Sequence, residues 1–290
     1  MKIPFFDLTY QYEQVKDKTM EAINQIFETQ HFILGKNINE FEQEFAKYCG
    51  TKYCVALSSG TDALLAALMA VDVGVGDEVI IPDFTFFATA GVVSRLGAKP
   101  VFVDIFPKTF CINPELVERA ITPKTKAIIP VHIFGQCAEM ESLNNISQQY
   151  NIPIIEDACQ AVGAEYKDGR RAGNLGLMGC FSFYPTKNLG GAGDSGAITT
   201  NDEKLYSKLK QMRNHGMEPK YYHSFVGGNF RMDEIQAAVL LAKLPLLDDY
   251  NNLRKINHNF YKKFFIDFQL FLHEEQNYLE QNFVLISGNS

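Results

Sequence analysis

KAIIPVHIFGQCAEMESLNNISQQYNIPIIED, residues 126–157, contains two short apolar runs, KAIIPV and IPIIED, separated by a longer and more polar stretch. Runs that are apolar at nearly every position are typical of parallel strands covered by helices on both faces. Parallel strands need a long crossover connection, which is usually a helix. The segment therefore predicts a strand, a crossover helix and a second strand.

The same alternation of short β-rich runs with helical stretches extends from about residue 52 to about residue 200. It predicts an α/β fold with a mostly parallel central sheet flanked by helices. The candidate strands are Tyr53–Leu57, Glu78–Pro82, Pro100–Asp104, Ala127–His132, Ile152–Glu156, Cys180–Phe183 and Gly196–Thr200.

Helical patterns flank this region on both sides. In residues 38–50 the apolar side chains of Ile38, Phe41 and Phe45 have helical spacing, so we expect this leader to pack on the sheet domain. Residues 233–265 also have a helical pattern, which Pro245 interrupts. We therefore predict a large domain over residues 1–245 and the start of a small C-terminal domain over residues 246–290.

The overall charge and hydropathy restrict the kind of partner. The formal net charge is −7 and no block of Lys and Arg occurs, which argues against a nucleic-acid surface. No stretch approaches the roughly 18 apolar residues of a membrane span, and the first residues lack a signal-peptide pattern. We expect a cytoplasmic protein whose partners are small molecules and other protein chains.

The cysteines do not have the spacing of a metal site. The sequence has six of them and no C-x-x-C pair. Tetrahedral zinc sites usually combine closely spaced cysteine and histidine ligands. We expect no metal and interpret the cysteines as buried small apolar residues.

Ser58-Ser59-Gly60-Thr61-Asp62 is the first segment that points to a ligand. It lies between the predicted strand YCVAL and the helical run ALLAALMAV. A turn of small residues at the start of a helix presents free N–H groups and the positive end of the helix dipole, which favours phosphate. An ordinary helix N-cap made of the same residue types is the alternative interpretation.

Asp157, in the segment IIEDACQ, follows the predicted strand ending at Glu156. Ligands of open α/β sheets bind at the carboxyl ends of the strands, so Asp157 is placed where a ligand would lie. A carboxylate there can keep a pyridine nitrogen protonated. A helix N-cap is again the alternative interpretation.

Lys187 lies in SFYPTKNLGG, residues 182–191, where a strand end leads into a loop with a glycine pair. A lysine among apolar and small neighbours can act as an amine nucleophile toward an aldehyde. The glycines allow the backbone to turn tightly and to approach a ligand. A solvated surface lysine is the alternative.

The order of phosphate turn, acid and lysine, together with the sequences around them, closely resembles the DegT/DnrJ/StrS family of fold-type I pyridoxal-phosphate (PLP) enzymes. The resemblance extends from about residue 3 to about residue 260. The segments that carry it are SSGTDALLAAL (58–68), PDFTFFATA (82–90), VHIFGQCAEM (131–140), EDACQAVGAEY (156–166), CFSFYPTKNLGG (180–191) and GGNFRMDEIQAAV (227–239).

The resemblance implies a role for each matching residue. Lys187 would hold the cofactor as a Schiff base and move protons, and Asp157 would pair with the pyridine nitrogen. Gln160 would lie near the phenolic oxygen, and Phe86 would stack on the cofactor ring. Without the resemblance, Phe86 fits a core position and Asn229 a turn. The remaining cofactor-binding residues implied are Ser59, Gly60, Thr61 and Ser182 and, from the neighbouring subunit of a homodimer, Asn229.

The implied activity is a two-step transamination, with L-glutamate as donor and a nucleotide-linked keto sugar as acceptor, in amino-sugar and surface-polysaccharide biosynthesis. VHIFGQ (131–136) and RNHGMEPKYYH (213–223) resemble members that aminate C3 more than those that aminate C4. Members that catalyse dehydration carry histidine in place of the lysine, so Lys187 argues against dehydration.

Two features depart from the family. Gly193-Asp194-Ser195-Gly196 replaces a Glu-Gly-Gly or Asp-Gly-Gly run, and we expect Ser195 to crowd a position that needs a positive φ. The C-terminal domain is expected to be incomplete, since residues 273–290 do not resemble the family's remaining strands, and to leave apolar side chains exposed. The alternative function is a truncated, catalytically impaired member that only binds PLP or dimerises. The side chains expected to be exposed are those of Phe260, Phe264, Phe265 and Phe268.

Overall fold

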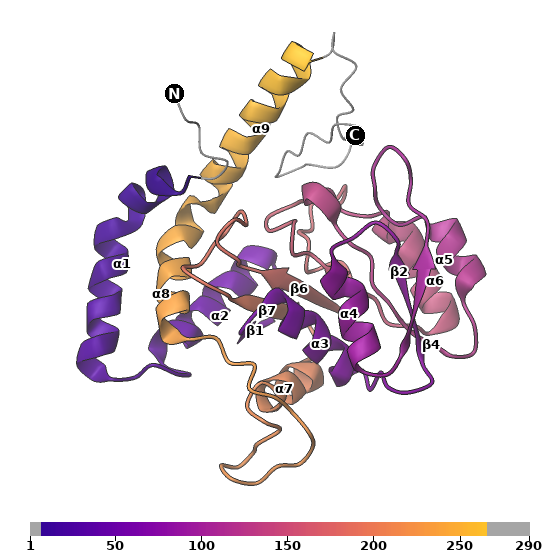
Figure 1. Ribbon diagram of the computed structural model, residues 1–290, viewed down its shortest axis with the longest axis horizontal. Helices are drawn as coiled ribbons and strands as arrows, with labels where there is room; N and C mark the ends of the chain where they lie inside the picture. Colours follow the sequence, from indigo (N-terminus) through magenta and orange to yellow (C-terminus); the bar gives the residue numbers. More distant parts are fainter. Residues whose placement is uncertain (1–6, 266–290) are drawn as a thin grey trace.

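The structure, a computed structural model, describes residues 7–265 and shows a central sheet with helices on both faces (Figure 1). The strands form two hydrogen-bonded groups, in the orders β3–β2–β4 and β1–β7–β6–β5. Parallel bridges from Ile128 to Ile154 and from Val131 to Asp157 link the two groups. The strands are β1 (Tyr53–Leu57), β2 (Glu78–Pro82), β3 (Lys99–Val103), β4 (Thr125–Ile128), β5 (Ile155–Asp157), β6 (Met178–Ser182) and β7 (Gly196–Thr200).

The predicted α/β fold with a mostly parallel sheet is confirmed, and β7 is the exception to the parallel order. It pairs antiparallel with both β1 and β6, because a loop rather than a crossover helix connects β6 to β7. The predicted strands Ala127–His132 and Ile152–Glu156 were too long. Pro130 and Pro153 fall within them, and proline cannot donate a ladder hydrogen bond.

Helices make up much of the rest of residues 7–265. The α-helices are α1 (Thr9–Thr29), α2 (Lys36–Cys49), α3 (Gly60–Ala70), α4 (Phe87–Arg95), α5 (Pro114–Ala120), α6 (Met140–Tyr150), α7 (Glu203–Met212), α8 (Glu234–Lys243) and α9 (Leu247–Phe265). Two short 3₁₀ turns, η1 (Ile133–Gly135) and η2 (Leu244–Leu246), complete the secondary structure of residues 7–265.

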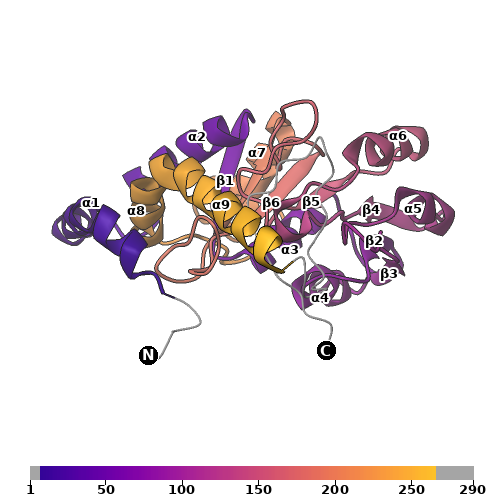
Figure 2. The ribbon, with the colours of Figure 1, turned by 90° about the horizontal axis from the view of Figure 1, so that it is seen from above.

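The sheet separates two apolar clusters. Alternate residues of β1 point to opposite sides, so that Ala56 belongs to one cluster and Val55 and Leu57 to the other. The first cluster includes side chains of α2, α5, α6 and α8, and the second those of α3, α4 and α7. Figure 2 shows α2 and α4 on opposite sides of the strands. Ile38, Phe41 and Phe45 of α2 are fully buried, as their spacing predicted.

A buried carboxylate fastens α8 to the start of α2. Glu234 is the first residue of α8, and its carboxylate accepts hydrogen bonds from the backbone N–H groups of Gly35, Asn37 and Ile38 at 2.6–3.1 Å. A negative charge at a helix N-terminus is stabilised by the helix dipole. Pro245 lies in η2, between α8 and α9, which follow one another along the same side of the molecule (Figure 1). The domain division at this proline stays a prediction.

Three further observations bear on the expectations from sequence. All six cysteines are free thiols; five are buried and Cys159 is half-buried. Burial raises the pKa of Cys111 to about 12. Within residues 7–265, no group of three His, Cys, Asp or Glu side chains is placed to hold a metal ion. Nor is any helix in that part long and apolar enough to cross a membrane.

The apolar side chains expected to be exposed on the last helix can be compared with the structure only where it describes them. Phe260 is 63% exposed, as expected. The side chains of Phe264 and Phe265, and all of Phe268, lie outside the residues described. Ser195 does not adopt a positive φ, so the expected crowding is wrong; its hydroxyl donates to the Phe183 carbonyl at 3.4 Å.

Candidate active site

A cavity of about 750 Å³ opens at the carboxyl ends of the parallel strands. Loops that follow β1, β2, β4, β5 and β6 line it, and this is the edge at which open α/β sheets bind ligands. The lining residues are Ser59, Gly60, Thr61, Leu64, Phe84, Thr85, Phe86, Ala88, Val131, Ile133, Phe134, Asp157, Cys159, Gln160, Ser182, Tyr184, Thr186, Lys187 and Asp194. Eight of the nine residues predicted for the site are among them, and Asn229 is not.

The turn between β1 and α3 forms one wall. The Ser59 side chain caps α3 by accepting a hydrogen bond from the Asp62 N–H at 3.0 Å, and Ser58 Oγ donates to Asp62 Oδ2 at 2.6 Å. Gly60 is the first residue of α3 and packs against Ser182, since a Cβ on Gly60 would lie 2.6 Å from the Ser182 Cβ. The N-cap interpretation and the phosphate interpretation are therefore compatible, because Ser59, Gly60 and Thr61 line the cavity at the start of the capped helix.

Asp157, the last residue of β5, is 5% exposed. Its Oδ2 accepts a hydrogen bond from Thr89 Oγ1 at 2.9 Å, and Oδ1 accepts one from the Cys159 N–H at 3.2 Å. Thr85 shares a 2.8 Å hydrogen bond with Thr89. The helix N-cap interpretation of Asp157 is wrong, because residues 158–164 form turns rather than a helix.

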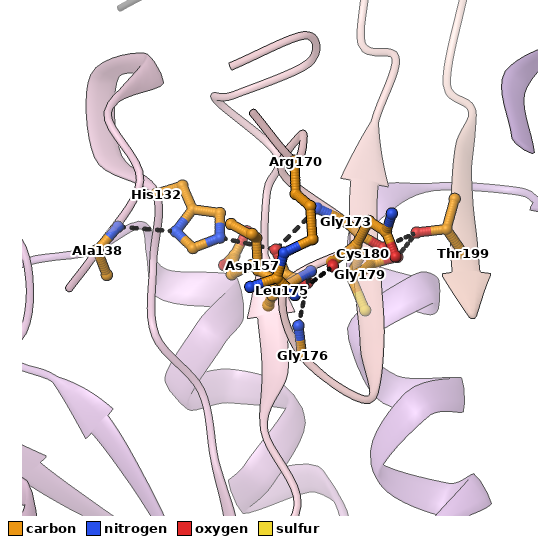
Figure 3. Close-up of polar contacts among 12 residues, drawn as sticks. His132, Ala138, Asp157, Arg170, Gly173, Leu175, Gly176, Gly179, Cys180 and Thr199 are labelled. Carbon is orange, nitrogen blue, oxygen red and sulfur yellow. Dashed lines mark hydrogen bonds and ion pairs between the residues drawn. The ribbon is translucent and has the colours of Figure 1, made fainter. Parts of the chain in front are cut away.

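Behind Asp157, Glu156 points to the other side of β5 and is fully buried. Its carboxylate accepts hydrogen bonds from the N–H groups of Gly173, Leu175 and Gly176 at 2.7–2.8 Å. It also lies 2.9 Å from Nε2 of His132, which is fully buried too (Figure 3). This carboxylate ties the loop 173–176 to the strand that carries Asp157.

His132 completes this network with a defined tautomer. The Ala138 N–H donates to His132 Nδ1 at 3.1 Å (Figure 3), so Nε2 carries the ring proton and donates a hydrogen bond to the Glu156 carboxylate. The His132 N–H also donates to the Asp157 carbonyl at 3.0 Å. The roles of both His132 and Glu156 were missed in the sequence analysis. The available signal was the pair of a histidine and a glutamate at the carboxyl ends of two predicted neighbouring strands.

Lys187 lies on the loop between β6 and β7, half-buried, and lines the cavity. The loop is closed at its base by hydrogen bonds from the Phe183 N–H to the Ser195 carbonyl and from the Gly191 N–H to the Phe183 carbonyl, both 2.8 Å. Phe183 packs edge-on against Phe45 of α2, with ring centroids 5.1 Å apart. The loop therefore starts from a rigid point of the core.

The other predicted residues fall into two groups. Gln160, Ser182 and Phe86 line the cavity, and Phe86 is 75% exposed at the N-cap of α4, which excludes the core interpretation. Asn229 is exposed and forms an isolated antiparallel bridge with Asn214 outside the cavity. A role at the site within one chain is therefore not supported for Asn229.

The residues present fit pyridoxal phosphate. The close approach of Gly60 to Ser182 leaves a helix start without a side chain, which suits a phosphate group. A lysine, a buried carboxylate and an exposed aromatic ring line the same cavity. The fold and the cavity together define a PLP-binding enzyme of the α/β class.

The comparisons with known proteins give the family. The chain belongs to the DegT/DnrJ/EryC1/StrS aminotransferase family, whose model matches residues 13–287. The match extends beyond residue 260, where the resemblance was expected to end, and part of it lies outside the residues that the structure describes. Enzymes of this family depend on PLP, and PLP is the cofactor of this chain.

Similar curated proteins come from several bacteria. The chain is 49% identical over 255 residues to the "Pleiotropic regulatory protein" of Geobacillus stearothermophilus, covering 88% of the chain and 68% of the relative. It is 48% identical over 253 residues to the UDP-2-acetamido-2-deoxy-3-oxo-D-glucuronate aminotransferase of Pseudomonas aeruginosa, covering 87% and 70%. It is 47% identical over 253 residues to the dTDP-3-amino-3,6-dideoxy-alpha-D-galactopyranose transaminase of Aneurinibacillus thermoaerophilus, covering 87% and 69%.

Solved structures agree with this assignment. DesV of S. venezuelae, in complex with a ketimine intermediate, superposes with a TM-score of 0.94 at 40% identity, covering 98% of this chain and 77% of DesV. A DegT DnrJ EryC1 StrS aminotransferase from Brucella abortus superposes with a TM-score of 0.93 at 36% identity, covering 97% and 77%.

Proposed function

We propose that the protein transfers an amino group from L-glutamate to the C3 keto group of a nucleotide-linked sugar, for amino-sugar and surface-polysaccharide biosynthesis. The observation that carries the proposal is that Lys187, Asp157 and the turn at Gly60 line the same cavity. The choice of acceptor is supported by the relatives whose names specify a 3-oxo or 3-amino sugar on UDP or dTDP.

Pyridoxal phosphate, when bound, acts as the electron sink that allows an amino group to leave one molecule and join another. Ser59, Gly60, Thr61 and Ser182 would hold its phosphate at the start of α3. Asp157 would hold the proton of the pyridine nitrogen, since a carboxylate that is only 5% exposed stabilises a nearby positive charge more strongly than one in water.

The remaining side chains would orient the reaction and move the proton. Lys187 Nζ would take the proton from Cα of the amino donor and later give it up again, so that one atom would act first as a base and then as an acid. Thr89 holds the Asp157 carboxylate in place through its 2.9 Å hydrogen bond. Phe86 would lie against the cofactor ring, where aromatic contact adds about 0.5–1.5 kcal/mol beyond area burial.

The proposed assembly is a homodimer with shared sites. Asn229 lies outside the cavity of its own chain and is exposed. Its place on the surface is compatible with a contact to the phosphate held by a neighbouring subunit. Phe87, which follows the cavity residue Phe86 and is 81% exposed, offers apolar surface to such a neighbour.

The test is a panel of UDP- and dTDP-linked 3-keto and 4-keto sugars offered to the PLP-loaded protein with L-glutamate. We expect 2-oxoglutarate and an amino sugar to form with 3-keto substrates. A Lys187→Ala sample measures uncatalysed exchange. Turnover of 4-keto sugars alone would refute amination at C3, and the absence of turnover with every keto sugar would refute the acceptor class.

A further inference from the structure

Side chains of α8 and α9 that do not line the cavity bind the loop that carries Lys187. On α8, Gln236 Oε1 accepts a hydrogen bond from the Ala192 N–H at 2.8 Å, and Lys243 Nζ donates to the Gly190 carbonyl at 2.7 Å. The two residues are seven apart, which places them on one face of the helix. Two turns of α8 thus fasten the backbone that follows Lys187.

Lys243 is buried, with 7% of the residue exposed, and burial lowers the pKa of its amine. Burying an ammonium group is unfavourable unless it is hydrogen-bonded. The bonded carbonyl belongs to Gly190, which packs so tightly on Pro185 that a Cβ would lie 2.4 Å from the Pro185 carbonyl oxygen. Lys243 therefore holds the loop at the point where Gly190 packs against Pro185.

Asn251 of α9 connects this loop to the segment that follows Asp157. It is 3% exposed, and its Oδ1 accepts a hydrogen bond from Asn188 Nδ2 at 2.7 Å. Its Nδ2 donates to the Val162 carbonyl at 3.2 Å. Asn188 is adjacent to Lys187, and Val162 is two residues beyond Gln160. One buried amide thus bridges the two chain segments that bear the lysine and the acid.

Neither Lys243 nor Asn251 lines the cavity, so neither can touch a ligand in it. We propose that Asn251 and Lys243 are positioning residues, which set the place of the Lys187 amine relative to Asp157 by fixing the loop 184–192. The inference rests on the proposed role of Lys187 in transamination. In this proposal α8 and α9, which follow Lys187 by more than 40 residues in the sequence, help to set the position of the amine that moves the proton. Figure 1 shows where the two helices lie.

The experiment compares PLP-loaded wild type with Asn251→Ala and Lys243→Met, with Asn252→Ala as the matched control because Asn252 is exposed on the same helix. Three quantities are measured: turnover of L-glutamate per bound PLP, the KM for L-glutamate, and the pH midpoint of the visible absorbance of the lysine-bound cofactor. The absorbance titration needs neither donor nor acceptor, so it is independent of the proposed substrates.

We expect both variants to lose about 10- to 100-fold in turnover per bound PLP, since small displacements of a catalytic group have effects of this size. The KM should change by less than about threefold, because ground-state binding is retained. The pH midpoint should move in both variants and stay fixed in Asn252→Ala. If Asn251→Ala fails to fold, Lys243→Met alone decides.

An unchanged pH midpoint together with unchanged turnover per bound PLP would overturn the inference, even if thermal stability fell, because a purely structural role lowers only the amount of loaded protein. Failure of the proposed acceptor has a different signature: the wild type would show the absorbance titration and the glutamate reaction but would aminate no keto sugar.

Discussion

Lys187 and Asp157 reach the cavity from neighbouring strands and need different surroundings. The lysine lies half-buried on a loop, whereas the acid is 5% exposed and receives a hydroxyl hydrogen bond from Thr89. An amine that moves protons needs freedom to reach two atoms, and a carboxylate that holds one charge needs a fixed position. We therefore expect substitution of Lys187 and substitution of Asp157 to have different consequences.

Replacing Lys187 by Ala should abolish transamination, with a loss of more than about 10³-fold, because the amine serves both as nucleophile and as proton carrier. Lys47→Ala, at an exposed side chain of α2 outside the cavity, is the matched control and should keep wild-type activity. Borohydride reduction of the loaded protein followed by peptide mapping should place the cofactor on Lys187. Label on a different lysine would contradict the assignment.

Asp157→Asn should retain PLP but react about 10²- to 10³-fold more slowly, since an amide keeps the hydrogen bond from Thr89 and loses the charge that holds the pyridine proton. Cofactor content is measured by absorbance after dialysis, and turnover by single-turnover kinetics with L-glutamate. Near-native turnover in the loaded variant would show that Asp157 does not act in this way.

Glu156→Gln should lower the free energy of unfolding by about 2–4 kcal/mol, because an amide cannot accept all of the hydrogen bonds that this buried carboxylate receives. Those bonds come from three backbone N–H groups and from His132. Urea unfolding gives the measurement. Glu44→Gln, at an exposed side chain, is the control, and an equal effect in both variants would argue against the network.

At the scale of secondary structure, α3 depends on a glycine at its first residue. Gly60→Ala would place a Cβ 2.6 Å from that of Ser182, so either the helix start or the strand end must shift. We expect PLP affinity to fall roughly tenfold or more, since overpacking of this kind costs about 1–3 kcal/mol. The Kd is measured by fluorescence titration.

Gly74→Ala is the matched control, because a Cβ at Gly74 meets no atom within 4 Å. It should bind PLP as the wild type does. If Gly60→Ala also bound PLP with wild-type affinity, the turn at the start of α3 would not be the phosphate site.

The strands were more predictable than the connections between them. Apolar runs identified all seven strands of the described sheet, because burial on both faces leaves a pattern in the sequence. The reversal of β7 was not foreseen, although a signal was present: residues 183–195 have no helical pattern, and parallel strands need a crossover connection that is usually a helix. The placement of Asp157 and Lys187 at the cavity was predictable from their positions after strands. His132 and Glu156 were missed, although both end predicted neighbouring strands. Lys243 and Asn251 were not predictable, because their roles depend on contacts between distant segments.

At the scale of the whole molecule, Asn229 tests whether sites are shared between subunits. Asn229→Ala should weaken PLP retention, because the side chain is expected to contact a phosphate in the neighbouring chain. Mixing this variant with Lys187→Ala should restore activity, since each hybrid dimer would contain one intact site; random exchange predicts about a quarter of wild-type sites. Subunit exchange can be proved by native mass spectrometry. If exchange occurs and activity is not recovered, the shared site is contradicted.

The antiparallel pairing of β1 with β7 also determines when the site can form as the chain is made. Residues 53–57 pair with residues 196–200, so the ladder cannot close until the ribosome has released about 200 residues. The turn at Ser59 follows β1 directly, and the Lys187 loop precedes β7. Both sides of the cavity are brought together by this late, long-range closure, and a cofactor that needs both can stabilise only a chain whose sheet is already complete.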